Sequence, residues 1–246
     1  LTAEPGRVPV RVGVSIGDTL AALHGVIGVM MALYHRKVNG GAGQVIDVAL
    51  HEAVFNCMES LIPEYSAFGT VREPAGSALP GIAPSNAYPC RDGWVLVAGN
   101  GDSIFKRLMA TIDRQDLADD AQLADNAGRV ARVAEIDAAI GIWTGQHSVA
   151  QVMERLAAAR VPAGKVYTAK DIAEDPHYQA RGMLQQQQTR DGYSITVPGV
   201  VPKLSATPGT VRTSAPHLGD DTDAVLMDAG LTREQIALLR GKGVIQ

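Results

Sequence analysis

Apolar residues recur at helical spacing near the start of the chain. They fall three or four positions apart, as in one face of an α-helix, at Leu20, Leu23, Ile27, Met30, Met31 and Tyr34. The pattern stops at Gly40–Gly43, and the preceding turn carries three basic residues, which suit a helix C-terminus. The β-branched run 45–50 then predicts a strand, and residues 8–14 predict another that leads into the helix.

The middle of the chain reads as a compact α+β unit after a loop-like stretch. A helix is expected over 51–61, whereas the Pro- and Gly-containing segment 62–84 lacks periodicity and is typical of a linker. Two β-rich runs, 86–90 and 94–98, flank Arg91-Asp92-Gly93, which predicts a hairpin turn. Helical patterns follow around 104–112, 121–126, 129–144 and 148–160. Asp102 or Ser103 is expected to cap the first of these helices.

The last third of the chain has short elements and little apolar periodicity. Its expected elements are a strand at 166–167, a helix over 168–174, a hairpin from 182–184 to 193–199, and helices over 222–228 and 232–240. Such an extended segment buries little of its own surface and is typical of one that lies against another domain. These patterns together divide the chain into 1–61, a linker at 62–79, a small domain at 80–164 and a tail at 165–246.

Composition and charge narrow the class of protein. Of 246 residues, 46% are hydrophobic and 20% charged, and the net charge is −4, which argues against a nucleic-acid or anionic-membrane partner. No run of 18 apolar residues exists, so no membrane span is expected. Two cysteines, Cys57 and Cys90, make no disulfide framework and predict reduced thiols in a cytoplasmic protein. The N-terminus has no Met and no signal-like segment, and it reads as the interior of a longer polypeptide.

Asp18 is the strongest candidate for chemistry, and its position allows two interpretations. An aspartate just before an apolar-periodic run is a preferred N-cap, and spacing alone favours that role. A carboxylate on the glycine-flanked turn Gly13–Gly17 can also approach an electrophile closely and act as a covalent nucleophile.

Other candidate motifs are weaker. Gly40–Gly43 leaves a helix and enters a strand, so it is interpreted as a C-cap and not as a phosphate loop. Gly99-Asn100-Gly101 follows a strand and precedes a helix, the order in which backbone N–H groups can face an anion or a carbonyl, although a plain turn has the same form. The histidines have no metal-ligand spacing, and no zinc site is expected.

Several motifs in order along the chain resemble those of the class III CoA-transferases, the CaiB/BaiF family. They are Gly17-Asp18, Leu23-His24-Gly25 with Ile27-Gly28, Gly43-Gln44-Val45-Ile46-Asp47-Val48, Ala98-Gly99-Asn100, Val161-Pro162-Ala163-Gly164, Val197-Pro198-Gly199 and His217-Leu218-Gly219 with Thr222. The resemblance implies an α/β fold in which a Rossmann-like large domain and a small domain form an interlocked dimer. It matches residues 1–61 to the end of the large domain and 165–246 to a tail that returns to it.

The resemblance also implies a mechanism and a site. Asp18 matches the catalytic aspartate, which attacks an acyl-CoA thioester to give an aspartyl anhydride and free CoA thiolate. Coenzyme A is then a substrate, and no separate cofactor or metal is implied. Backbone at Gly81 and at Gly99, Asn100 and Gly101 is expected to orient the thioester or the anhydride. The partners implied are an acyl-CoA, plausibly succinyl-CoA, a small carboxylic acid and a second copy of the chain.

Two departures from the family pattern bear on the assignment. The N-terminal Rossmann portion that supplies most CoA contacts has no counterpart here, so a separate or cleaved N-terminal half is expected to complete the enzyme. The segment Leu79–Pro84 is not glycine-rich, which disfavours formyl-CoA as the substrate. Two alternatives stay open: an α-methylacyl-CoA racemase or isomerase in which Asp18 is the acid/base, and a non-catalytic assembly fragment.

Overall fold

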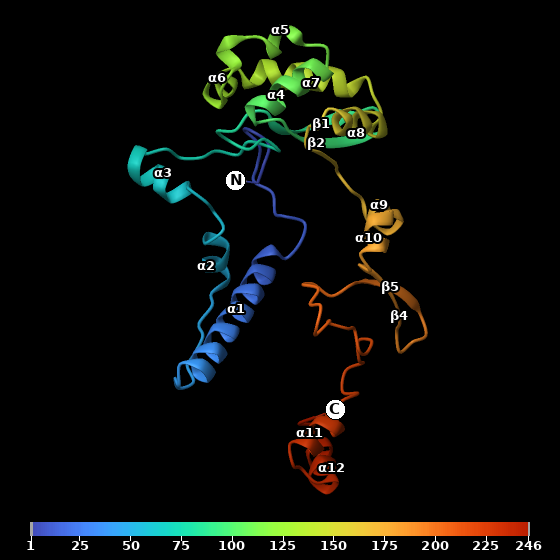
Figure 1. Cartoon of the computed structure of the whole chain (residues 1–246). Coiled ribbons are helices and arrows are strands. Elements are labelled where there is room, and N and C mark those ends of the chain that lie inside the picture. The colour runs from blue at the N-terminus through green and yellow to red at the C-terminus, as the bar shows by residue number, and fades with distance from the viewer. Residues whose placement is uncertain (1, 246) are drawn as a thin grey trace. The chain divides into compact units, whose positions relative to one another are not determined.

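A computed structural model describes residues 2–245 of the chain. The structure separates into two compact units, residues 1–166 and 167–246. Its elements in chain order are coloured from blue to red in Figure 1. The further division of the first unit at residues 61 and 79 stays a prediction.

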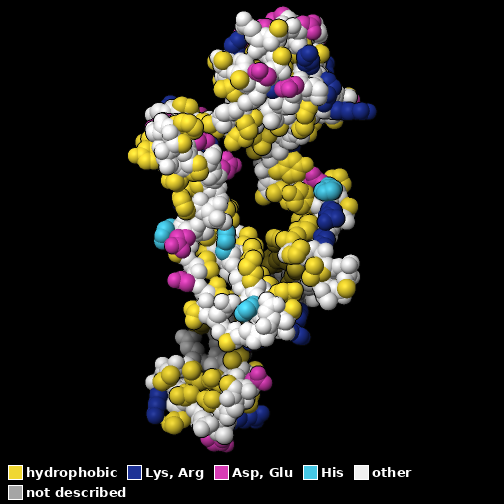
Figure 2. All heavy atoms as spheres, turned by 60° about the vertical axis from the view of Figure 1, so that its left-hand side comes forward, with side chains coloured by type: hydrophobic (Ala, Val, Ile, Leu, Met, Phe, Trp, Pro, Cys, Tyr) yellow, Lys and Arg dark blue, Asp and Glu magenta, His cyan; other side chains and the backbone are white. Residues whose placement is uncertain are grey.

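The first unit begins with a long helix, α1 (Ile16–Val38), as the apolar spacing predicts. Its apolar side chains occur all round the helix, and none is buried among the described residues. Those most open to solvent include Val26, Met30, Met31 and Tyr34. Figure 2 shows in yellow the hydrophobic side chains on the visible face of the molecule. A helix that is apolar on every face is normally covered on every face, so α1 has the surface of a core helix.

Helix α1 passes the length and composition test for a membrane-spanning helix, although no membrane span was expected from the sequence. The helix spans 23 residues and contains an 18-residue window with a mean hydropathy of 1.6, so it is long and apolar enough to cross a bilayer by length and composition alone. The helix contains no 18 consecutive apolar residues, because Asp18, Thr19 and His24 interrupt its apolar positions. A core helix of a soluble protein passes the same test.

Neither strand expected around α1 forms. Residues 8–14 and 40–49 are extended or irregular, and Val45 is 94% exposed. A strand requires a neighbouring strand for its ladder of hydrogen bonds. Within the described residues these two segments have only isolated backbone bonds, such as Val10 N–H to the Thr2 carbonyl at 2.8 Å. Helix α2 (Leu50–Phe55) is shorter than expected, and α3 (Leu61–Phe68) lies within the stretch that sequence indicated as a linker.

A small α+β domain forms the best-packed part of the first unit. Strands β1 (Ser85–Cys90), β2 (Gly93–Ala98) and β3 (Ala163–Lys165) pair antiparallel in the order β1-β2-β3. Cys90 pairs with Gly93, so the expected hairpin is confirmed. The strand expected at Val166–Tyr167 instead ends at Lys165.

Helices cover one face of this sheet. They are α4 (Asp102–Thr111), α5 (Gln115–Ala118), the 3₁₀ turn η1 (Ala121–Leu123), α6 (Asn126–Ala131), α7 (Val133–Gly145) and α8 (Val149–Ala158). Helix α7 packs against β1, and α8 against β2 and β3. The core between them includes the fully buried Val95, Leu108 and Ile136. This domain is therefore a rigid support for two loops, the one that contains Gly81 and the one at Gly99–Gly101.

The second unit contains short helices and one hairpin. Its elements are α9 (Ala169–Glu174), α10 (Pro176–Ala180), β4 (Leu184–Gln188), β5 (Ser194–Pro198), α11 (Thr222–Asp228) and α12 (Arg233–Gly241). Strands β4 and β5 pair antiparallel, which confirms the expected second hairpin. Ile236 is a buried residue of this unit, whose elements otherwise leave most apolar side chains exposed.

Candidate active site

Asp18 lies in the first turn of α1 but does not cap it. The N-cap is Ser15, which makes no side-chain capping bond, and Asp18 occupies the third helical position. Its side chain is exposed, and no hydrogen bond or ion pair within residues 2–245 uses its carboxylate. The N-cap interpretation is therefore wrong. A carboxylate at this position is favoured by the helix dipole and keeps both oxygens available.

His24 belongs to the packing of α1 and not to a dyad with Asp18. Its Nδ1 lies 2.8 Å from the Leu20 carbonyl oxygen, and its Nε2 lies 3.2 Å from Asn56 Nδ2. Both ring nitrogens of His24 therefore have hydrogen-bonding partners other than Asp18. The ring thus joins α1 to the segment after α2.

Gly81 lies on a turn before β1 and keeps a free amide. Its φ of +79° is in the left-handed region, where glycine is strongly favoured. The Gly81 carbonyl accepts a hydrogen bond from Asn126 Nδ2 at 2.8 Å, whereas its N–H has no partner in the described part of the chain. Gly81 is exposed, so this N–H can meet a ligand.

The three residues from Gly99 to Gly101 have different structural roles. Gly99 is buried, and its N–H donates to the Pro84 carbonyl at 2.9 Å, so this amide is already used. Gly101 is the N-cap of α4, in place of the expected Asp102 or Ser103. The N–H groups of Asn100 and Gly101 have no acceptor among residues 2–245. They are the free donors of this loop.

Two side chains of α6 hold these loops, and sequence analysis missed both. Asn126 Oδ1 accepts from Ala83 N–H at 3.1 Å while its Nδ2 donates to Gly81. Arg129 donates from Nε to the Ala83 carbonyl at 3.1 Å and from Nη2 to the Asn100 carbonyl at 2.8 Å. We call Asn126 and Arg129 the α6 pair. Their three-residue spacing places them on one helix face.

Arg129 is buried with its hydrogen-bonding groups occupied. The side chain is 1% exposed, lies 5.2 Å from the centroid of the Phe105 ring, and also bonds the Leu123 carbonyl at 3.1 Å. Its charge is balanced by Asp102, whose Oδ1 lies 2.7 Å from Nη2. A buried guanidinium requires such partners, because an unpaired charge in the core is very costly. The local sequence gives no signal for this role, because Arg132 follows three positions later in the same segment.

The most strongly perturbed carboxylate lies away from Asp18. Hydrogen bonds from Arg72 and Ser60 lower the pKa of Glu64 from 4.5 to about 2. Its partner Arg72 lines a cavity of about 280 Å³ together with Cys57 and Leu79. Because Glu64 neutralises Arg72, the cavity offers no spare cation to an acidic substrate.

The structure describes the Asp18 turn and the two glycine loops as separate parts of the site. No hydrogen bond or ion pair within the described residues joins Asp18 to Gly81 or to Gly99–Gly101. Gly81 and Gly99–Gly101 are brought together, through the Gly99–Pro84 bond and the α6 pair. Residues 2–245 contain no cluster of three His, Cys, Asp or Glu side chains that could hold a metal ion.

Curated relatives match the whole chain. Succinyl-CoA--D-citramalate CoA-transferase of Chloroflexus aurantiacus is 41% identical over 247 residues, which are 100% of this chain and 61% of the relative. Succinyl-CoA--L-malate CoA-transferase beta subunit of the same organism is 37% identical and covers 100% of this chain and 62% of the relative. The chain thus spans about three fifths of the length of these relatives.

Solved structures and a family model agree with these relatives. A CAIB/BAIF family protein from Brucella suis has a TM-score of 0.75 and 30% identity, covering 93% of this chain and 59% of its own. The model described as CoA-transferase family III matches residues 1–222. The chain therefore belongs to CoA-transferase family III.

Proposed function

We propose that this chain carries the catalytic aspartate of an enzyme that transfers CoA from an acyl-CoA to a small carboxylic acid. The observation that carries the proposal is Asp18, an exposed carboxylate without an internal partner in the described residues, in a chain of CoA-transferase family III. Relatives named as CoA-transferases for citramalate and malate support succinyl-CoA as the donor and a dicarboxylic acid as the acceptor. CoA is a substrate in this scheme, and no further cofactor is required.

The reaction begins at the thioester carbonyl carbon. An oxygen of Asp18 attacks it, a C–O bond forms, the C–S bond breaks, and the electron pair leaves with the CoA thiolate. The acceptor carboxylate then attacks the aspartyl carbonyl and releases the donor acid. The thiolate finally attacks the acceptor's acyl carbon, which forms the new thioester and restores Asp18.

Free backbone amides support the charge that develops on the carbonyl oxygen. Gly81 N–H, Asn100 N–H and Gly101 N–H are without partners in the described residues. Gly99 allows its loop to pack closely but supplies no free donor, because its N–H is hydrogen-bonded to the Pro84 carbonyl. One such donor is typically worth about 10²–10³ in kcat when it meets an oxyanion.

The proposed assembly is a cytoplasmic homodimer. A further polypeptide segment, equivalent to the part of the relatives that lies outside the match, completes each subunit. The uncovered apolar surface of α1 supports this, since an all-round apolar helix requires protein contacts on every side or a bilayer. The unpaired extended segment 40–49 supports it as well, because its backbone groups require neighbours.

The test measures CoA exchange directly. The chain is assayed alone and after fusion to the part of the D-citramalate relative that lies outside the match. Each form is incubated with succinyl-CoA and a panel of carboxylic acids in D₂O, and every CoA ester is identified by mass. We expect a new thioester, and none with Asp18→Asn, which keeps size and hydrogen bonding. Deuterium at the α-carbon without a new thioester would contradict transfer and support a racemase.

A further inference from the structure

Arg129 controls the orientation of one peptide plane in the loop before α4. Its Nη2 donates to the carbonyl oxygen of Asn100 at 2.8 Å, and the same nitrogen donates to Asp102 Oδ1 at 2.7 Å. The Asn100–Gly101 peptide bond is trans. Within the described residues the cis bonds are those at Ala83–Pro84 and Val201–Pro202. In a trans peptide the C=O and the following N–H point in opposite directions. The Gly101 N–H is therefore directed away from Arg129.

The surroundings of Gly101 make this orientation relevant to a ligand. Gly101 is half-buried, and its N–H has no acceptor within the described residues. The guanidinium that fixes the plane is held in turn by the carbonyls of Ala83 and Leu123 and by packing on Phe105. A donor that is unpaired in the protein but fixed in direction is the arrangement needed for preorganised stabilisation of an oxyanion.

We propose that Arg129 is a positioning residue, which holds the Asn100–Gly101 peptide so that Gly101 N–H donates to the carbonyl oxygen of the acyl-CoA thioester and of the anhydride. This inference rests on the proposed transferase function and adds a specific donor and its support. Arg129 touches no substrate in this arrangement. Its effect passes through one peptide plane.

Asn126 performs the matching task for the other loop. Its side-chain amide both accepts from Ala83 N–H and donates to the Gly81 carbonyl. A carboxylate of the same shape cannot make the second bond, because it has no donor at neutral pH. Asn126 thus fixes the turn that presents the free Gly81 N–H, while Arg129 joins this turn to Asn100 through the Ala83 carbonyl.

The first experiment measures loop order by NMR relaxation and needs no activity. We expect the Gly101 amide to have an order parameter of about 0.85 in the native chain and below about 0.6 in Arg129→Lys. Lysine keeps the charge but lacks the planar fork that reaches several acceptors. Asn126→Ala should lower the order parameter of the Gly81 amide, and the order parameter of the Gly101 amide should stay higher than that of Gly81.

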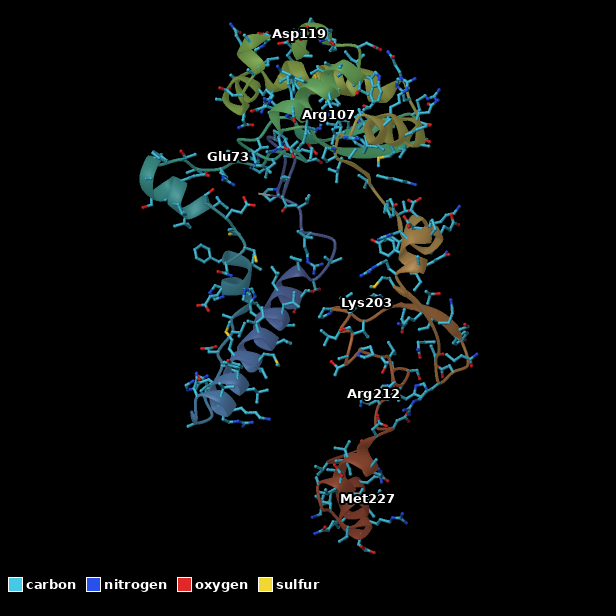
Figure 3. The ribbon with its side chains drawn as sticks, in the orientation of Figure 1. Glu73, Arg107, Asp119, Lys203, Arg212 and Met227 are labelled. Carbon is cyan, nitrogen blue, oxygen red and sulfur yellow. The ribbon has the colours of Figure 1, made fainter. Side chains whose placement is uncertain are left out.

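The matched control is Arg107→Lys. Arg107, labelled on α4 in Figure 3, also donates to backbone carbonyls, at Ser103, Ala159 and Arg160, but to none in the two loops. This variant should keep both glycine amides ordered. Equal order parameters for Gly101 in Arg129→Lys and in Arg107→Lys would overturn the proposal.

The second experiment separates positioning from folding by steady-state kinetics of the active form identified above. Arg129→Lys is expected to lower kcat at least tenfold, with KM for succinyl-CoA within about twofold, because the donor acts on developing charge. Loss of rate only in proportion to the unfolded fraction would contradict the role. If Arg129→Lys does not fold, Arg129→Gln takes its place and must show the same split of kcat from KM for the proposal to stand. Transfer absent from the native protein refutes the proposed function, and the relaxation result then decides the positioning claim.

Discussion

Gly99 provides the sharpest test of how the loop before α4 is built. A Cβ atom at this position would lie 2.5 Å from Leu108 Cδ2 and 3.0 Å from Pro84 Cγ. Carbon atoms normally approach no closer than about 3.5 Å, so Leu108 would have to move by about 1 Å. Leu108 has no solvent-exposed surface, and the ring of Pro84 is buried and rigid. Gly99→Ala is therefore an overpacking mutation.

The magnitude follows from the packing of that core. Extra methyl groups in a well-packed interior typically cost about 1–3 kcal/mol, and the contact with Pro84 favours the upper part of that range. The hydrogen bond from Gly99 N–H to the Pro84 carbonyl joins the same two segments, so they cannot move apart to admit the methyl group without breaking it. We expect Gly99→Ala to lower the free energy of unfolding of the small domain by about 2 kcal/mol.

The assay is urea unfolding followed by the fluorescence of Trp143, which is buried in the same domain. The matched control is Gly141→Ala, within α7, where a Cβ would meet no heavy atom within 4 Å. There alanine should raise the stability by about 0.5–1 kcal/mol, because it restricts the unfolded chain and favours helix.

A double-mutant cycle identifies the cause. The side chain of Leu108 makes the closest contact with the new methyl group. Gly99→Ala should therefore lower the free energy of unfolding less in a Leu108→Ala background than in the native protein. A Gly99→Ala protein as stable as the native one, or a cycle without coupling, would refute the close approach of Gly99 to Leu108.

Three further changes test other parts of the structure. Asp137→Ala leaves Tyr88 Oη and Asn86 Nδ2 without the acceptor that now lies 2.6 and 3.0 Å away, and should cost about 1–3 kcal/mol in urea unfolding; no change would contradict the buried pairing. Ser148→Ala removes the capping box of α8 and should cost about 1 kcal/mol, whereas Ser148→Gly should cost only a few tenths. The folded pKa of Glu64 lies below its ordinary value, so its stabilisation is present above pH 4.5 and is lost as pH falls towards 2. The stability difference between the native chain and Glu64→Gln should shrink across that window in acid titrations monitored by circular dichroism, and a constant difference would contradict the Arg72 contact.

Local signals in the sequence predicted the helices and hairpins that depend on near neighbours. Helix α1 has an uninterrupted apolar period, and the turn Arg91–Gly93 has a strong hairpin signal, so both were foreseeable. The strands expected at 8–14 and 45–50 do not form in this chain. A strand depends on its partner as much as on its own residues, and no partner is present among the described residues.

The support of the loops could not be read from spacing. In the two loops, Asn126 and Arg129 bond carbonyls that lie more than 25 positions away in sequence, and nothing local indicates which carbonyls they reach. The order of strand, turn and helix indicated Gly99–Gly101, whereas Gly81 was indicated only with the family resemblance. The structure separates their roles, because Gly99 is a packing residue whereas Asn100 and Gly101 keep free amides.

The central claim is that Asp18 forms an anhydride with the acyl group of the donor, and trapping that bond tests it most directly. The active form is mixed with succinyl-CoA and hydroxylamine, digested, and sequenced by mass spectrometry. Hydroxylamine attacks the aspartyl carbonyl of the anhydride, displaces succinate, and leaves a hydroxamate on the aspartate. We predict the hydroxamate at Asp18, dependent on succinyl-CoA and absent from Asp18→Asn. Turnover with an unlabelled Asp18, or labelling at another carboxylate such as Asp47 or Asp102, would contradict the account.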